Sequence, residues 1–97
     1  MLVKIHKSYR DIVAVCDSEL LGKKFEQGKA VLELTDFYNG EGISEAELIS
    51  LMKSYATEDA TFNIAGEKSI QAAIKAGIVS KEGIKTVQDI PFALVLL

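Results

Sequence analysis

Apolar and polar residues alternate along this chain in short blocks that predict strands, and twice they recur at helical spacing. Residues 2–6 and 11–16 are β-branched and apolar runs separated by a short polar turn, which predicts an N-terminal β-hairpin. The second run is apolar on both faces, so we expect its strand inside the sheet. Residues 30–35 alternate, with Leu32 and Leu34 inward, which is typical of a strand covered on one face.

The clearest local signal is a helix start at Ser44. Ser44 and Glu47 have the spacing of a capping box, and apolar residues at helical spacing continue to about Ala56. Residues 60–65 predict a second buried strand. An amphipathic helix over about 67–76 follows it, and a glycine suited to a left-handed conformation ends that helix.

Three further segments carry weaker signals. Asp17 is placed to cap a short helical turn that Gly22 ends. Residues 36–42 predict a loop with two exposed aromatic side chains. After Pro91, the run 92–97 is wholly apolar, so we expect a strand whose faces are covered by the chain itself or by a partner surface.

These elements predict one α+β domain over residues 1–97. The expected architecture is a mixed β-sheet of about five strands with two main helices, the N-terminal β-hairpin and a βαβ-like unit at residues 60–97. We expect one parallel pair of strands across the second helix, joined by a right-handed crossover.

Composition and charge limit the function classes. The hydrophobic share of 48% and the charged share of 26% are ordinary for a folded domain. A single cysteine, an early charge at the N-terminus and no long apolar run predict a cytoplasmic protein that does not enter a membrane. The net charge is −3, so binding of bulk duplex nucleic acid is not expected.

Few side chains carry reactive chemistry. His6 and Cys16 could meet on adjacent strands, but Cys16 ends an apolar strand, where cysteine behaves as a small hydrophobic residue. Two such residues do not supply the four ligands of a zinc site. We therefore predict no catalytic residue, no metal site and no cofactor, and we favour a protein that is not an enzyme.

One polar cluster stands at a strand-to-helix junction and is the candidate ligand site. It comprises Asn63, Gly66, Glu67 and Lys68, beside the free N–H groups of a helix start. An anion could bind these amides, with Lys68 as its counter-charge. Gly66 and Glu67 are also what an ordinary helix start favours, so the cluster has a purely structural explanation as well.

Six stretches that span nearly the whole chain in order carry a family resemblance: residues 2–6, 13–17, 19–23, 37–38, 63–67 and 77–79. On these residues the chain resembles the small archaeal proteins of the domain of unknown function 424 family. The resemblance implies an archaeal cytoplasmic protein without an assigned activity, and suggests a role around translation or RNA metabolism.

Two main hypotheses of function follow. The first is a non-catalytic binding or adaptor domain whose partner is a protein or a structured RNA. The rival is a small-ligand-binding protein or enzyme with an anion site at residues 63–68. A homodimer through the C-terminal apolar strand is a further possibility. Partner contacts under the first hypothesis are the basic and aromatic residues Lys4, Lys7, Arg10, Lys23, Lys24, Phe37 and Tyr38.

Overall fold

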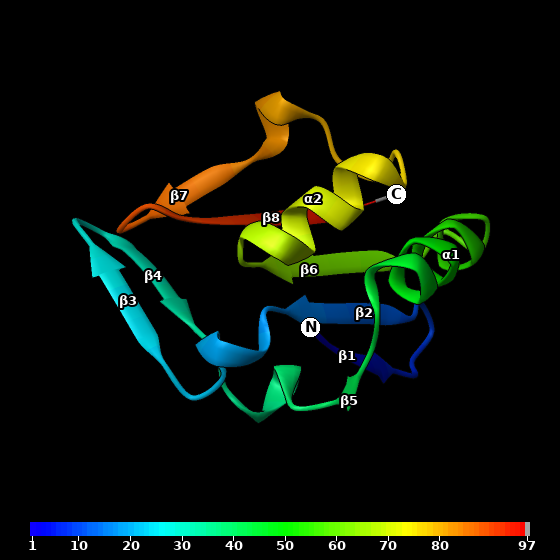
Figure 1. Cartoon of the computed structure of the whole chain (residues 1–97), viewed down its shortest axis with the longest axis horizontal. Coiled ribbons are helices and arrows are strands. Elements are labelled where there is room, and N and C mark those ends of the chain that lie inside the picture. The colour runs from blue at the N-terminus through cyan, green and yellow to red at the C-terminus, as the bar shows by residue number, and fades with distance from the viewer. Residues whose placement is uncertain (97) are drawn as a thin grey trace.

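The computed structural model describes residues 1–96, and within them the chain folds as α+β (Figure 1). Two α-helices, α1 (Glu45–Ala56) and α2 (Glu67–Lys75), accompany a mixed six-stranded sheet and a separate two-stranded one. Three short 3-10 helices, η1 (Ser18–Leu20), η2 (Asp36–Tyr38) and η3 (Lys81–Gly83), lie in the connections. The strands are β1 (Leu2–His6), β2 (Ile12–Cys16), β3 (Lys24–Gln27), β4 (Ala30–Glu33), β5 (Glu41–Gly42), β6 (Thr61–Ala65), β7 (Lys85–Val87) and β8 (Ile90–Leu96).

The main sheet has the strand order β5-β1-β2-β6-β8-β7. The predicted N-terminal hairpin is confirmed, since β1 and β2 pair antiparallel. β2 lies inside the sheet as expected, where it pairs with β6 in parallel. This is the parallel pair of the sheet, and its connection includes the hairpin β3–β4 and helix α1.

The predicted pairing of parallel strands across α2 needs correction, although their direction does not. β6, α2 and β8 follow in order, but β8 pairs antiparallel with β6. The chain leaves α2, reaches the far edge of the sheet as β7, and turns back through Gln88 and Asp89. β7 therefore runs in the same direction as β6, and β8 is inserted between them. The predicted parallel neighbours are separated by this returning strand.

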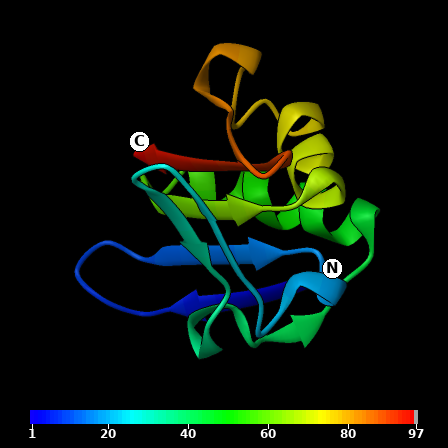
Figure 2. The ribbon, with the colours of Figure 1, turned by 90° about the vertical axis from the view of Figure 1, so that its left-hand side faces the viewer.

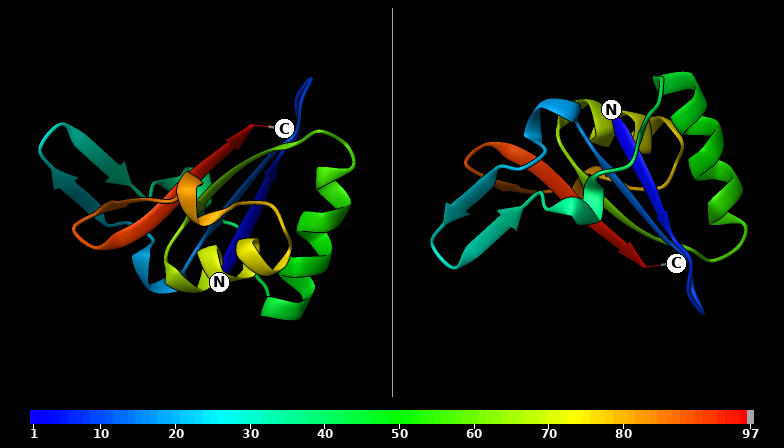
Figure 3. Two further views of the ribbon diagram at one scale, coloured as in Figure 1. Left: turned by 90° about the horizontal axis from the view of Figure 1, so that it is seen from above. Right: turned by 90° about the horizontal axis from the view of Figure 1, so that it is seen from below.

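Both helices cover one face of the sheet (Figure 3). The capping box at Ser44 forms as predicted, and α1 ends at Ala56. α2 ends in the predicted glycine conformation, because Gly77 has a φ of 75°. The core on this face joins side chains of β2, β6, α1 and α2, including Val13, Val15, Leu48, Met52, Phe62, Ile64 and Ile70.

The second face of the sheet is covered by a different set of elements. The hairpin β3–β4 lies across one end of the sheet (Figure 2) and buries Leu32 and Leu34, as predicted, against the Cys16 end of β2. The turn between β7 and β8 holds the hairpin, since Gln88 donates from its backbone N to Gln27 Oε1 at 2.8 Å. Tyr38 corrects the sequence prediction, because its ring is buried in this second core rather than exposed.

Within residues 1–96, neither α1 nor α2 is long and apolar enough to cross a membrane.

Candidate functional site

The start of α2 is capped by a side chain that directly follows β2 and lies far from α2 in the sequence. The carboxylate of Asp17, directly after β2, accepts a hydrogen bond from the backbone N of Lys68 at 3.1 Å. It also accepts from Ser69, from the backbone N at 2.8 Å and from Oγ at 2.8 Å. Asp17 is almost completely buried. The predicted cap of η1 by this side chain does not form, because Asp17 caps α2 instead.

Gly66 makes this contact possible. Its φ is 106°, a region that side chains rarely adopt, and an added Cβ would overlap the carboxyl group of Asp17. Gly66 is thus the N-cap of α2, as predicted, but it provides no capping side chain. The free helix N–H groups that the sequence suggests for a ligand already bind an internal carboxylate.

The charges around the helix start also argue against an anion there. The hollow next to it is lined by the acidic residues Asp17, Glu19, Glu67 and Asp89. An anionic ligand would have to displace one carboxylate and lie close to three others. Glu67 and Lys68 are exposed and lie together on the outer side of α2, where Lys75 pairs with Glu45 at 3.1 Å.

Asn63 does not join this cluster. It is opposite Ala14 on β2 and Leu94 on β8, and it alternates with Phe62 and Ile64, which face the helices. Its side chain therefore belongs to the second face of the sheet. The structure separates Asn63 from Gly66, Glu67 and Lys68, which the sequence predicts as one site.

His6 and Cys16 also lie apart. They are on the same face of the sheet, but Cys16 is opposite Leu2, at the other end of β1 from His6. Four residues of strand separate the two positions by about 13 Å. Cys16 is fully buried, and burial, with a smaller effect of Asp17, raises the pKa of its thiol to about 11. His6 donates from Nε2 to the carbonyl of Phe37 at 2.8 Å and stacks on the Phe37 ring.

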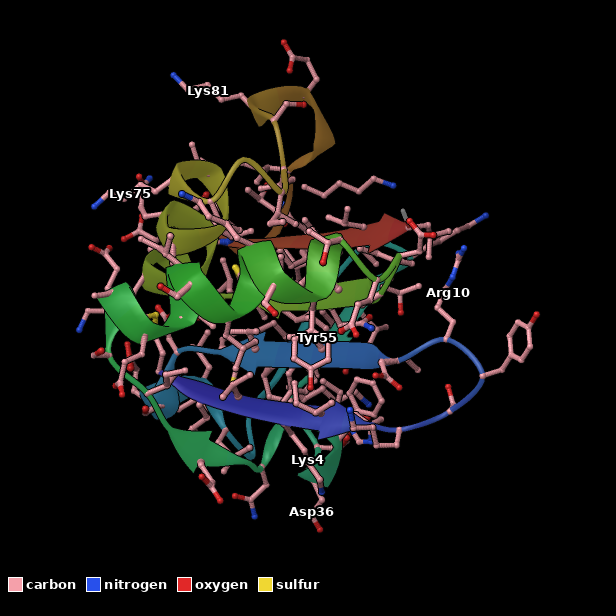
Figure 4. All side chains as sticks on the ribbon, turned by 90° about the vertical axis from the view of Figure 1, so that its right-hand side faces the viewer. Lys4, Arg10, Asp36, Tyr55, Lys75 and Lys81 are labelled. Atoms are coloured by element: carbon pink, nitrogen blue, oxygen red, sulfur yellow. The ribbon has the colours of Figure 1, made fainter. Side chains whose placement is uncertain are left out.

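The predicted basic contacts fall into two groups at opposite ends of the sheet. Lys7 and Arg10 belong to the loop between β1 and β2, which Figure 4 shows extending on the side away from α2. Lys7 pairs with Asp11 at 3.2 Å. Lys23 and Lys24 lie at the base of the hairpin β3–β4, beyond the other end of β2.

The remaining predicted contacts lie at η2. Lys4 binds the backbone carbonyl of Asp36 at 3.2 Å, next to it in Figure 4. Phe37 is half-buried against His6, whereas Tyr38 is buried and presents no contact surface.

The largest exposed apolar side chains near the main sheet lie where the hairpin β3–β4 does not reach. Leu94 is 61% and Leu96 is 69% exposed, although both belong to a strand of the main sheet. They share the second face with half-buried Thr61 and Asn63. Tyr9, fully exposed, lies in the β1–β2 loop at the same end of the sheet. We call this surface the open end; it comprises Tyr9, Arg10, Ile12, Thr61, Asn63, Leu94 and Leu96.

Sequence reasoning identified the open end only in part. The wholly apolar run after Pro91 indicated that β8 needs cover, and the structure shows that the chain leaves half of it uncovered. Arg10 was among the predicted contacts. Tyr9, beside Arg10 in the polar turn, is at the surface as its position in the sequence predicts, but it was not among the predicted contacts.

The fold defines the chain as a compact α+β domain with helices on one face of a mixed sheet and a partly uncovered second face. The chain belongs to the family described as "Protein of unknown function (DUF424)", whose model matches residues 6–97. This confirms the family resemblance of the sequence.

A crystal structure of an uncharacterized conserved protein from Methanopyrus kandleri has the same fold. The two chains are 21% identical, the TM-score is 0.85, and the match covers 98% of this chain and 90% of that one. At this identity the likeness shows the fold alone. No curated protein matches the chain significantly.

Proposed function

We propose that the protein is a non-catalytic binding domain that contacts a partner protein through its open end. The observation that carries this proposal is the exposure of Leu94 and Leu96 on a strand of the main sheet. Apolar side chains of a sheet face are normally covered, and an uncovered group of them marks a contact surface. The buried thiol of Cys16 suits a reducing compartment, so we place the protein in the cytoplasm.

The rim of the open end has the composition of a protein contact. Tyrosine and arginine are the residue types that most often anchor interfaces, and Tyr9 and Arg10 are both exposed in the adjoining loop. No ion pair within residues 1–96 engages Arg10. Its guanidinium is therefore available to a carboxylate of the partner.

Structured RNA is the less favoured partner. Leucine side chains offer no stacking surface for bases, and the Phe37 ring is already stacked on His6 at a centroid distance of 4.2 Å. Tyr9 is exposed, but it lies in a loop and is not part of a row of rings on the sheet face. The basic residues are also split between two ends of the molecule. A role in translation or RNA metabolism would therefore be exercised through a protein contact.

The test is a capture experiment from extract of the source organism, with and without nuclease. The immobilised wild-type chain should retain a specific protein in both conditions. The double variant Tyr9→Ala/Arg10→Ala should lose it, and Gln71→Ala, on the outer side of α2, should retain it.

Three outcomes would contradict the proposal. Capture that disappears with nuclease indicates RNA as the partner. Capture that survives the double variant places the contact elsewhere. A wild-type chain that retains nothing specific argues against an adaptor altogether.

A further inference from the structure

The outer edge of β8 is only half covered. β7 pairs with Ile90, Pro91 and Phe92, and the ladder ends there. Beyond it, residues 93–96 pair with β6 on one side, and no backbone hydrogen bond within residues 1–96 reaches their other side. This segment is therefore an unpaired strand edge of the main sheet.

The hydrogen-bond pattern shows which residues present free groups at this edge. The backbone N of Gly66 donates to the carbonyl of Pro91 at 2.8 Å, so this pair is hydrogen-bonded. Antiparallel ladders alternate, so Ala93 and Val95 also bond to β6, while Leu94 and Leu96 direct their N–H and C=O groups outward. The two exposed leucines thus carry the unpaired backbone groups as well.

The other edges of the main sheet are short or carry charged or polar side chains. β5 pairs only with Leu2 and Val3, and the rest of the β1 edge contains Lys4 and His6, whose side chains bind η2. β5 is two residues long and contains Glu41, and β7 is three residues long and begins with Lys85. Short edge strands with charged side chains are the usual means by which proteins prevent edge pairing. Residues 93–96 contain neither a charge nor a proline. The outer edge of β8 is therefore unpaired along residues 93–96, where all side chains are apolar.

We propose that a second copy of the chain adds its own β8 to this edge, antiparallel, about a twofold axis at Val95. Leu94 then lies opposite Leu96 of the second copy, and each pair exchanges the outward hydrogen bonds. The segment is complementary to itself, because the same free groups and the same apolar side chains face each other. A partner strand with charged side chains would meet no opposite charge along residues 93–96.

The pairing extends the sheet across two copies and brings their open ends together on one face. It shares Leu94 and Leu96 with the proposed function, but the backbone groups of the edge carry it, so the double variant Tyr9→Ala/Arg10→Ala should still dimerise. A four-residue edge is smaller than a standard interface, so we expect an equilibrium between monomer and dimer that depends on concentration.

Charge-swapped variants test the pairing by light scattering after size exclusion. The wild type should shift with concentration from 10.6 kDa towards twice that mass. Leu94→Lys/Leu96→Lys and Leu94→Glu/Leu96→Glu should each be monomeric, with dissociation constants raised about 100-fold or more by like charges across the strands. An equimolar mixture of the two variants should restore the dimer, which also shows that both are folded.

Two single variants separate this edge from other surfaces. Leu94→Pro removes only an outward N–H and should abolish the dimer with an unchanged circular dichroism spectrum. Val31→Lys, at the exposed apolar position of β4, should dimerise like the wild type. A wild type that stays monomeric at the highest concentration, charge variants that stay dimeric, or a dimeric Leu94→Pro would overturn the inference.

Discussion

The cap that Asp17 provides for α2 leads to the most specific prediction of stability. Replacing Asp17 with alanine removes three hydrogen bonds to a carboxylate, two of them at 2.8 Å to Ser69, which is fully buried. The two donors of Ser69 are buried and would lose their acceptor. The change therefore costs more than the loss of an ordinary exposed helix cap.

The magnitude follows from three contributions. Loss of an N-cap costs about 1 kcal/mol, each buried donor left unsatisfied costs about 1–3 kcal/mol, and a carboxylate at a helix start contributes up to about 2 kcal/mol. These contributions overlap, so we expect Asp17→Ala to lower the free energy of unfolding by about 3–5 kcal/mol. Domains of this size have about 5–15 kcal/mol in total, so the variant should be close to unfolding.

Urea unfolding followed by circular dichroism measures this loss. Asp17→Asn keeps one acceptor oxygen but turns an amide group towards the helix N–H groups. Its free energy of unfolding should therefore lie between those of the wild type and Asp17→Ala. Glu19→Ala is the matched control, since Glu19 is an exposed acid on the neighbouring η1 and should change stability by less than about 0.5 kcal/mol. A loss below about 1 kcal/mol for Asp17→Ala would refute the reasoning.

Three further predictions concern the surroundings of this cap and the helix α1. Gly66→Ala should lower the free energy of unfolding by about 3 kcal/mol or more in the same urea assay, because its φ of 106° and the Asp17 carboxyl exclude a side chain. The Cys16 thiol, whose pKa burial raises to about 11, should react with a disulfide reagent at pH 8 only after unfolding; rapid labelling of the native protein would contradict its burial. Hydrogen bonds from Ser44 lower the pKa of Glu47 from its ordinary value, so the stabilisation by Glu47 is complete above the unfolded pKa and is lost as the pH falls through the folded pKa. In Glu47→Ala, the urea midpoint should decrease less steeply at acid pH than in the wild type. An unchanged dependence of the midpoint on pH would count against the capping box.

The sequence predicts those parts of the fold that depend on neighbouring residues. The capping box at Ser44, the glycines at both ends of α2 and the N-terminal hairpin each rest on residues a few positions apart. In these cases the local conformation that the residues favour is also the one that the fold requires.

The parts that the sequence does not predict depend on distant contacts. β3 has no alternating apolar pattern, and it is a strand because β4 pairs with it and Gln88 binds its end. The turn at Gln88 and Asp89 has positive φ at both residues without a glycine, so the return of β8 between β6 and β7 leaves no turn signal. Asp17 has the sequence signal of a local cap, but its donors lie more than fifty residues away.

Two of the stretches that carry the family resemblance are neighbours in space. The run ending at Asp17 and the run 63–67 lie on adjacent parallel strands, with Cys16 opposite Ala65, and Asp17 lies against Gly66. Their residues are the ones that close this junction: the carboxylate that caps α2 and the glycine that leaves room for it. Asp17 and Gly66 thus have a structural role in the fold at this place. The contact surface that we propose lies elsewhere, at the open end, where Leu94 and Leu96 are exposed.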